Sequence, residues 1–73
     1  MQQAYSFNLW AGDDRAIAVR TYSLTSDVDA SAMSFTLMRD NPQVAAIDVR
    51  RQDGRIVLRR ERVAGKTVVL RLR

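Results

Sequence analysis

Residues 44–63, VAAIDVRRQDGRIVLRRERV, predict a β-hairpin around which the other elements can be arranged. The Asp53-Gly54 pair is the strongest short hairpin signal in the chain. We expect a two-residue turn there, which opposes Val49 to Leu58 and Arg51 to Ile56 on one face. On the other face this register opposes Asp48 to Arg59, a cross-strand pair of opposite charges that favours it. The first strand of the hairpin is expected at residues 44–51.

The hairpin is continued by one more strand on its C-terminal side. Ala64-Gly65-Lys66 predicts a three-residue loop with Gly65 in the left-handed conformation. In this register the last strand places Leu70 opposite Arg60 and Leu72 opposite Leu58.

A second hairpin is expected at the N-terminus. Residues 5–9 alternate apolar and polar side chains, residues 11–14 form a turn cluster, and residues 16–21 follow as a strand. A three-residue loop at residues 12–14 would make three pairs of opposed residues. These are Leu9 with Ile17, Phe7 with Val19, and Tyr5 with Thr21.

One helix separates the two hairpins. Ser26 is a typical N-cap, and Asp29 completes a capping box three residues later. We expect the helix to span residues 27–39 and to end before Pro42, because the residue before a proline disfavours helical geometry.

These elements predict an α+β fold, β-β-α-β-β-β, with a single helix packed on a four- to five-stranded antiparallel sheet. Residues 1–73 then form one small domain. Because the helix carries the chain back along the sheet, we expect the strand order 2-1-3-4-5.

Composition excludes several function classes. The 73-residue chain has a formal net charge of +4 and contains neither cysteine nor histidine. Disulfides, zinc and haem sites and histidine-based nucleophile systems are therefore not expected, and we expect no cofactor, no metal and no enzymatic activity. The longest apolar runs are four residues, and no signal peptide is apparent, which predicts a cytoplasmic protein with no membrane contact.

Basic residues are concentrated in the C-terminal third of the chain. Residues 1–49 hold three basic and six acidic side chains, whereas residues 50–73 hold nine basic and two acidic ones. One interpretation is a surface that binds nucleic acid or an acidic partner. The other is a solvated face that protects sheet edges from aggregation. The candidate residues are Arg50, Arg51, Arg55, Arg59, Arg71 and Arg73, whereas Arg60 and Arg62 are expected on the helix side.

The helix has two apolar sides, and one sheet can cover only one of them. We expect Val28, Ala32 and Phe35 to pack on the sheet, because the converse packing leaves Phe35 exposed. The opposite side would then form a protein interface, together with two aromatic residues expected on the sheet face away from the core. The alternative is that Met33 and Leu37 lie at the boundary of a wide buried stripe. The candidate interface residues are Trp10, Tyr22, Ala30, Met33 and Leu37.

Together these features predict a small non-enzymatic domain that acts by protein–protein interaction, with a protein partner or as a homodimer. One concrete version is an accessory or inhibitory factor of a phage or mobile element that acts on a nucleoprotein complex. The alternative is a DNA- or RNA-binding protein of weak sequence specificity that uses an arginine-rich sheet face.

Overall fold

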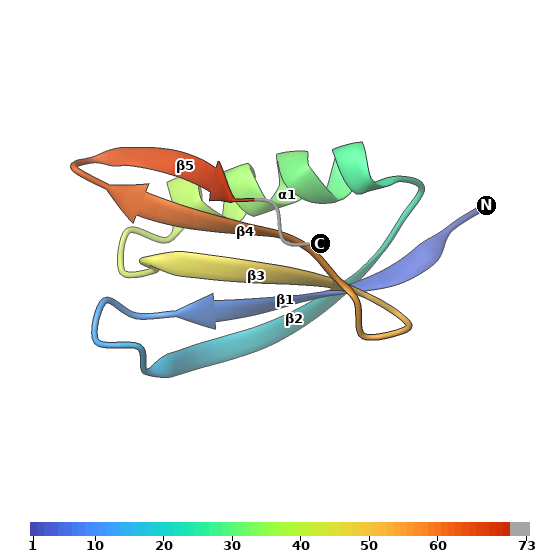
Figure 1. The fold of residues 1–73 in the computed structure, drawn as a ribbon, viewed down its shortest axis with the longest axis horizontal. Helices are drawn as coiled ribbons and strands as arrows, with labels where there is room; N and C mark the ends of the chain where they lie inside the picture. The colour runs from blue at the N-terminus through green and yellow to red at the C-terminus, as the bar shows by residue number, and fades with distance from the viewer. Residues whose placement is uncertain (71–73) are drawn as a thin grey trace.

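The computed structural model describes residues 1–70. It confirms the α+β fold: one helix lies across one face of a five-stranded antiparallel sheet (Figure 1). The strand order β2-β1-β3-β4-β5 is the predicted one. The elements are β1 (Gln3–Trp10), β2 (Ala16–Leu24), α1 (Asp27–Asp40), β3 (Ala46–Arg51), β4 (Ile56–Val63) and β5 (Lys66–Leu70).

Side-chain hydrogen bonds cap both ends of α1; the cap at Ser26 was predicted, and the one at Asn41 was not. Ser26 has extended backbone geometry, and its hydroxyl accepts a hydrogen bond of 3.2 Å from the Asp29 amide. At the C-terminus the Asn41 side-chain amide donates to the Leu37 carbonyl at 2.8 Å, and Pro42 follows. The predicted N-cap at Ser26 is therefore confirmed, with the helix one residue longer than expected. The predicted capping box is not completed, because the Asp29 carboxylate accepts a hydrogen bond from the Thr25 hydroxyl and not from the Ser26 amide.

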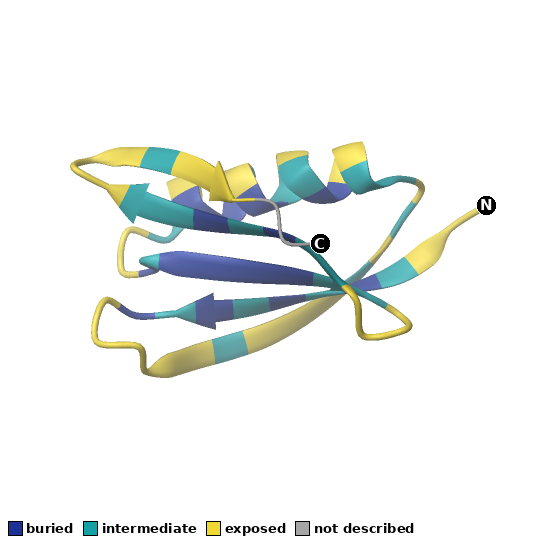
Figure 2. Cartoon of the chain, in the orientation of Figure 1, coloured by how far each residue is buried: buried dark blue, intermediate teal, exposed yellow. Residues whose placement is uncertain are grey.

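The core lies between α1 and the interior strands of the sheet, of which β1 and β3 are the most buried (Figure 2). Alternate residues of β1 point toward the helix. The strand β3 starts at Ala46, two residues later than predicted. The buried core cluster consists of Tyr5, Phe7, Leu9, Ala30, Leu37, Met38, Val44, Ile47, Val49 and Leu58.

The predicted register between β1 and β2 is wrong by one residue. The loop at residues 12–14 does form, closed by a hydrogen bond of 2.8 Å from the Ala11 amide to the Arg15 carbonyl. A β-bulge then shifts the pairing between Leu9 and Trp10. As a result Val19 is 66% exposed on the open face, and Arg20 opposes Phe7 in its place. Tyr22, which opposes Tyr5, packs against the core instead.

The turn at Gly54 is also longer than predicted. A hydrogen bond of 2.9 Å from the Arg51 amide to the Arg55 carbonyl closes a three-residue loop, in which Gly54 has a φ of +89°. A bulge between Val49 and Arg50 then restores the expected pairs further along, so Val49 opposes Leu58 and Asp48 opposes Arg59. Ile56 opposes Arg50 rather than Arg51.

The last turn is shorter than predicted. Ala64 and Gly65 both have positive φ, 52° and 81°, which is the geometry of a two-residue hairpin turn whose twist matches that of the strands. Leu70 therefore opposes Arg59 and lies on the open face, not opposite Arg60. The predicted position of Leu72 lies outside the described residues.

The predicted packing of the helix is wrong. Ala30 and Leu37 are buried, and Met33 packs against the core cluster. The side predicted to pack on the sheet is exposed, with Val28 at 76% and Phe35 at 47%. The physical reason is Ser34, which is fully buried in the middle of the packed face and hydrogen-bonded to Arg60, so the buried face of α1 is not wholly apolar.

The predicted interface residues are therefore not available as one surface. Ala30, Met33 and Leu37 belong to the core side of the helix. Tyr22 also packs against the core, contrary to expectation, and its ring meets that of Phe7 edge to face at 5.5 Å. Trp10 does lie on the open face of the sheet, beside Asp48.

Candidate functional site

The arginines predicted to form one basic face are divided between the two faces of the sheet. Arg50 and Arg59 lie on the open face, in the same rows as Ser6 and Asp48. Arg51 instead contacts the first turn of the helix, and Arg55 is exposed in the Gly54 turn. Arg71 and Arg73 lie outside the described residues. Within residues 1–70 the structure does not bring the predicted arginines together.

On the open face, Arg59 takes part in a network of charges across three strands. Its guanidinium donates to the Asp48 carboxylate at 2.8 Å and lies 3.8 Å from Glu61. The Trp10 indole N–H donates to the other Asp48 oxygen at 3.0 Å. The hydrogen bond with Asp48 raises the pKa of Arg59 above its ordinary value. Because Arg59 is paired with acids of the same sheet, little of its positive charge is available to a binding partner.

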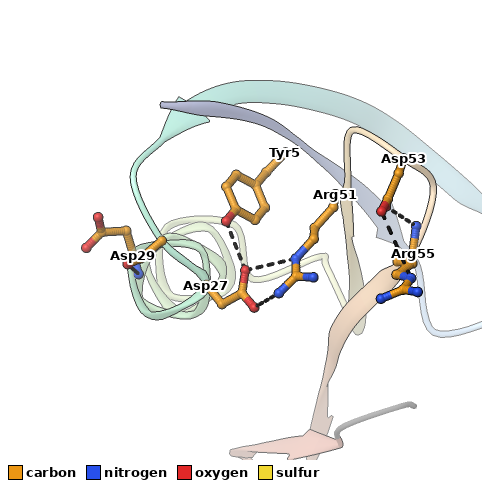
Figure 3. A network of polar contacts seen from close by, with 7 residues as sticks. Tyr5, Asp27, Asp29, Arg51, Asp53 and Arg55 are labelled. Carbon is orange, nitrogen blue, oxygen red and sulfur yellow. Dashed lines mark hydrogen bonds and ion pairs between the residues drawn. The ribbon is translucent and has the colours of Figure 1, made fainter. Parts of the chain in front are cut away.

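Arg51 is paired on the helix side (Figure 3). Its guanidinium donates to both oxygens of Asp27, and the Tyr5 hydroxyl donates to the same carboxylate at 2.9 Å. The hydrogen bond with Asp27 raises the pKa of Arg51. Asp27 lies in the first helical turn, where a negative charge is favoured by the helix dipole. This network ties β1 and β3 to the start of α1, which is a structural role.

The Tyr5 hydroxyl gives a test of this network. Burial and the bond to Asp27 raise the pKa of Tyr5 above its ordinary value of 10.0. A raised folded-state pKa supplies stability that is complete below the unfolded-state pKa and is lost as the pH rises through the folded-state pKa. We therefore expect the urea midpoint to fall as the pH rises above about 10, and Tyr5→Phe to reduce this fall. An equal alkaline loss in both proteins would contradict a contribution from Tyr5.

Arg60 and Arg62 lie on the helix side, as predicted, but their internal hydrogen bonds were not predicted. Arg62 donates to the Val44 carbonyl at 3.2 Å and to the Met38 carbonyl at 2.8 Å, near the C-terminal end of α1. Arg60 is 8% exposed and donates to Ser34 at 2.9 Å. The available signal was the alternation in β4, in which Arg60 and Arg62 continue the row of the apolar residues Ile56 and Leu58.

A pocket of about 500 Å³ lies beside Arg60, between α1 and the strands β4 and β5. The helix packs mainly on β3 and β4, and Val69 on the helix-facing side of β5 remains partly exposed. Aliphatic side chains dominate the walls, and Asp27, Ser31 and Arg60 supply polar groups. The aliphatic lining residues are Val28, Ala32, Val57, Leu58 and Val69.

The outer edge of β5 is the second surface feature of this region. β5 pairs with β4 on one side, and in the described part of the chain no strand pairs with its other side. Val68 and Leu70 on the open face and Val69 on the helix face are 44%, 42% and 37% exposed. Sequence reasoning missed this feature, because the shifted register moved Leu70 to the wrong face.

Residues 1–70 contain no group of three or more His, Cys, Asp or Glu side chains placed to hold a metal ion. Over the same residues no helix is both long enough and apolar enough to span a membrane. No protein-family model, curated protein or solved structure matches the chain. The pocket beside Arg60 and the outer edge of β5 remain as the candidate binding surfaces.

Proposed function

We propose that this protein is a non-enzymatic binding domain that adds an extended segment of a partner protein to its sheet, beside β5. The observation that carries the proposal is the open edge of β5, where three apolar residues remain exposed on both faces of the strand. Strand addition uses the backbone hydrogen-bonding groups of such an edge for affinity and the alternate side chains for specificity. An accessory or inhibitory role on a nucleoprotein complex stays a prediction.

A comparison of the two edge strands supports this choice. In β2, Arg20 lies directly opposite Phe7, so a charged side chain occupies the core-facing row of that edge, and it is exposed. Charges in such positions oppose the pairing of a further strand. The only charged residue described in β5 is Lys66, at its first position. The edge at β5 is therefore the less protected of the two.

The proposed partner is another protein rather than a second copy of the chain. A second copy joined through β5 alone would pair five described residues per chain. Stable protein interfaces bury about 1,200–2,000 Å² in total, so such a dimer needs further contacts. A nucleic-acid partner has less support, because Arg51 and Arg59 are paired with Asp27 and Asp48.

The proposal can be tested with extended peptides selected from a random display library on the wild-type domain. We expect the selected peptides to alternate apolar and polar residues, and to slow hydrogen exchange at β5 amides. Val68→Lys introduces a charge at the edge and is expected to weaken binding by about tenfold or more. Val19→Lys, the matched change on the open face of β2, should leave binding unchanged.

Three outcomes would contradict the proposal. They are protection of amides outside β5, equal loss of binding in the Val68→Lys and Val19→Lys proteins, and a wild-type dimer in sedimentation equilibrium that excludes the peptides. The last outcome would identify a second copy as the occupant of the edge.

A further inference from the structure

Arg60 is a buried cation whose hydrogen bonds all go to neutral groups. Its Nε donates to the Ser34 hydroxyl at 2.9 Å, and one terminal nitrogen donates to the Thr67 hydroxyl at 3.2 Å. The other terminal nitrogen lies 3.3 Å from both the carbonyl and the hydroxyl oxygens of Ser31. The Phe35 ring centre is 5.5 Å from the guanidinium carbon. The guanidinium is thus oriented from both the helix and the sheet.

The lack of a carboxylate partner sets Arg60 apart from Arg51 and Arg59. Its burial sets it apart from Arg62, which also donates to neutral carbonyl groups but is more exposed. Arg51 and Arg59 each bind a carboxylate, whereas Arg60 makes no ion pair with any acid in residues 1–70. A buried charge without a counterion is unfavourable. Desolvation accordingly lowers the pKa of Arg60. An anion that reached this guanidinium would gain a charge-assisted interaction away from bulk water.

The pocket beside Arg60 provides the route for such an anion. Its volume of about 500 Å³ lies within the usual range for small-molecule sites. Val28 and Ala32 from the helix and Val69 from β5 are among its aliphatic walls. Asp27 also lines the pocket, but its carboxylate is paired with Arg51, which offsets its repulsion of an incoming anion.

We propose that this pocket binds a small aliphatic carboxylate, with the carboxylate on Arg60 and the hydrocarbon chain on the apolar walls. The planar guanidinium suits a carboxylate, and the terminal nitrogen that contacts Thr67 has two N–H groups for that single acceptor. The aliphatic lining suits an alkyl chain. This site goes beyond the proposed strand addition, since it uses the helix-facing side of the sheet rather than the edge of β5.

Octanoate is a suitable probe, and its binding can be followed by NMR on the ¹⁵N- and methyl-labelled protein. We expect octanoate to shift the Arg60 side-chain N–H signal together with the Val57 and Val69 methyl signals. Octanol lacks the charge and acetate lacks the chain, so both should bind at least about tenfold more weakly. Failure of octanoate to bind, or equal binding of octanol, would overturn the proposal without affecting the strand-addition experiment.

Two variants separate the role of Arg60 in binding from its role in the fold. Arg60→Gln should weaken octanoate binding by about tenfold or more, whereas Arg55→Gln, at an exposed turn position, should not. Because Arg60→Gln removes internal hydrogen bonds, Ala32→Phe gives an independent test. Ala32 is exposed at the pocket wall, so a larger side chain there should block the pocket while leaving the core and Arg60 in place. Octanoate binding that survives Ala32→Phe unchanged would overturn the proposed site.

Discussion

Leu37→Glu is expected to unfold the domain at neutral pH. Leu37 is only 9% exposed and packs in the core between the helix and the sheet. The substitution removes a large apolar side chain and requires a carboxylate to be buried in its place, which together cost several kcal/mol. A chain of 73 residues has a total stability of about 4–11 kcal/mol, and small domains lie toward the lower end. The circular dichroism of the variant should therefore be that of an unfolded chain at room temperature.

Val28→Glu is the matched control for this change. Val28 is 76% exposed on the opposite side of α1, in the first turn, where a negative charge interacts favourably with the helix dipole. We expect this variant to fold with a melting temperature close to that of the wild type. If Leu37→Glu folds and Val28→Glu does not, the helix packs through the other side, as the sequence alone had suggested.

The fold was predictable because its signals are local. The N-cap at Ser26, the helix stop before Pro42 and the three turns that contain Gly12, Gly54 and Gly65 each depend on a few adjacent residues. Together they divide the chain into the correct six elements. The strand order followed from the path of the helix between the two hairpins.

The registers were not predictable in full, because two of them depend on one inserted residue each and the third, between β4 and β5, depends on a turn one residue shorter than expected. Both of the bulges, near Trp10 and Arg50, lie close to turns and have no glycine at the bulge itself. A single such residue changes which side chains face the core. At Gly54 the longer loop and the bulge compensate, so Asp48 and Arg59 still meet. In the first hairpin no second irregularity compensates the bulge. Val19 therefore lies on the open face instead of in the core, and Tyr22 packs against the core instead of on the open face.

The candidate site was less predictable than the fold, because it depends on contacts between distant residues. Arg60 and Ser34 are 26 residues apart, and their hydrogen bond helps to determine which side of the helix is buried. Likewise, the ion pair of Arg51 with Asp27 joins residues 24 positions apart and turns an expected surface cation toward the helix. Counting charges along strands finds the arginines but not their partners.

Phe7→Ala is expected to destabilise the domain by about 3–5 kcal/mol, because the Phe7 side chain is fully buried. The observed register adds a more specific consequence. Tyr22 contacts Phe7 edge to face, with ring planes inclined at 74°, whereas Val19 lies on the other face of the sheet. Aromatic pairs of this kind contribute about 0.5–1.5 kcal/mol beyond the area they bury. Removal of the Tyr22 ring should therefore lower the free energy of unfolding. Val19→Ala should change it by less than about 0.5 kcal/mol.

Double-mutant cycles in urea distinguish the two registers directly. Phe7→Leu keeps most of the core volume and removes the ring, so it can be combined with Tyr22→Leu or with Val19→Ala without complete unfolding. We expect a coupling energy of about 0.5–1.5 kcal/mol between Phe7 and Tyr22 and a coupling near zero between Phe7 and Val19. The reverse pattern would restore the register without a bulge, which places Val19 beside Phe7 in the core and moves Tyr22 to the open face of the sheet.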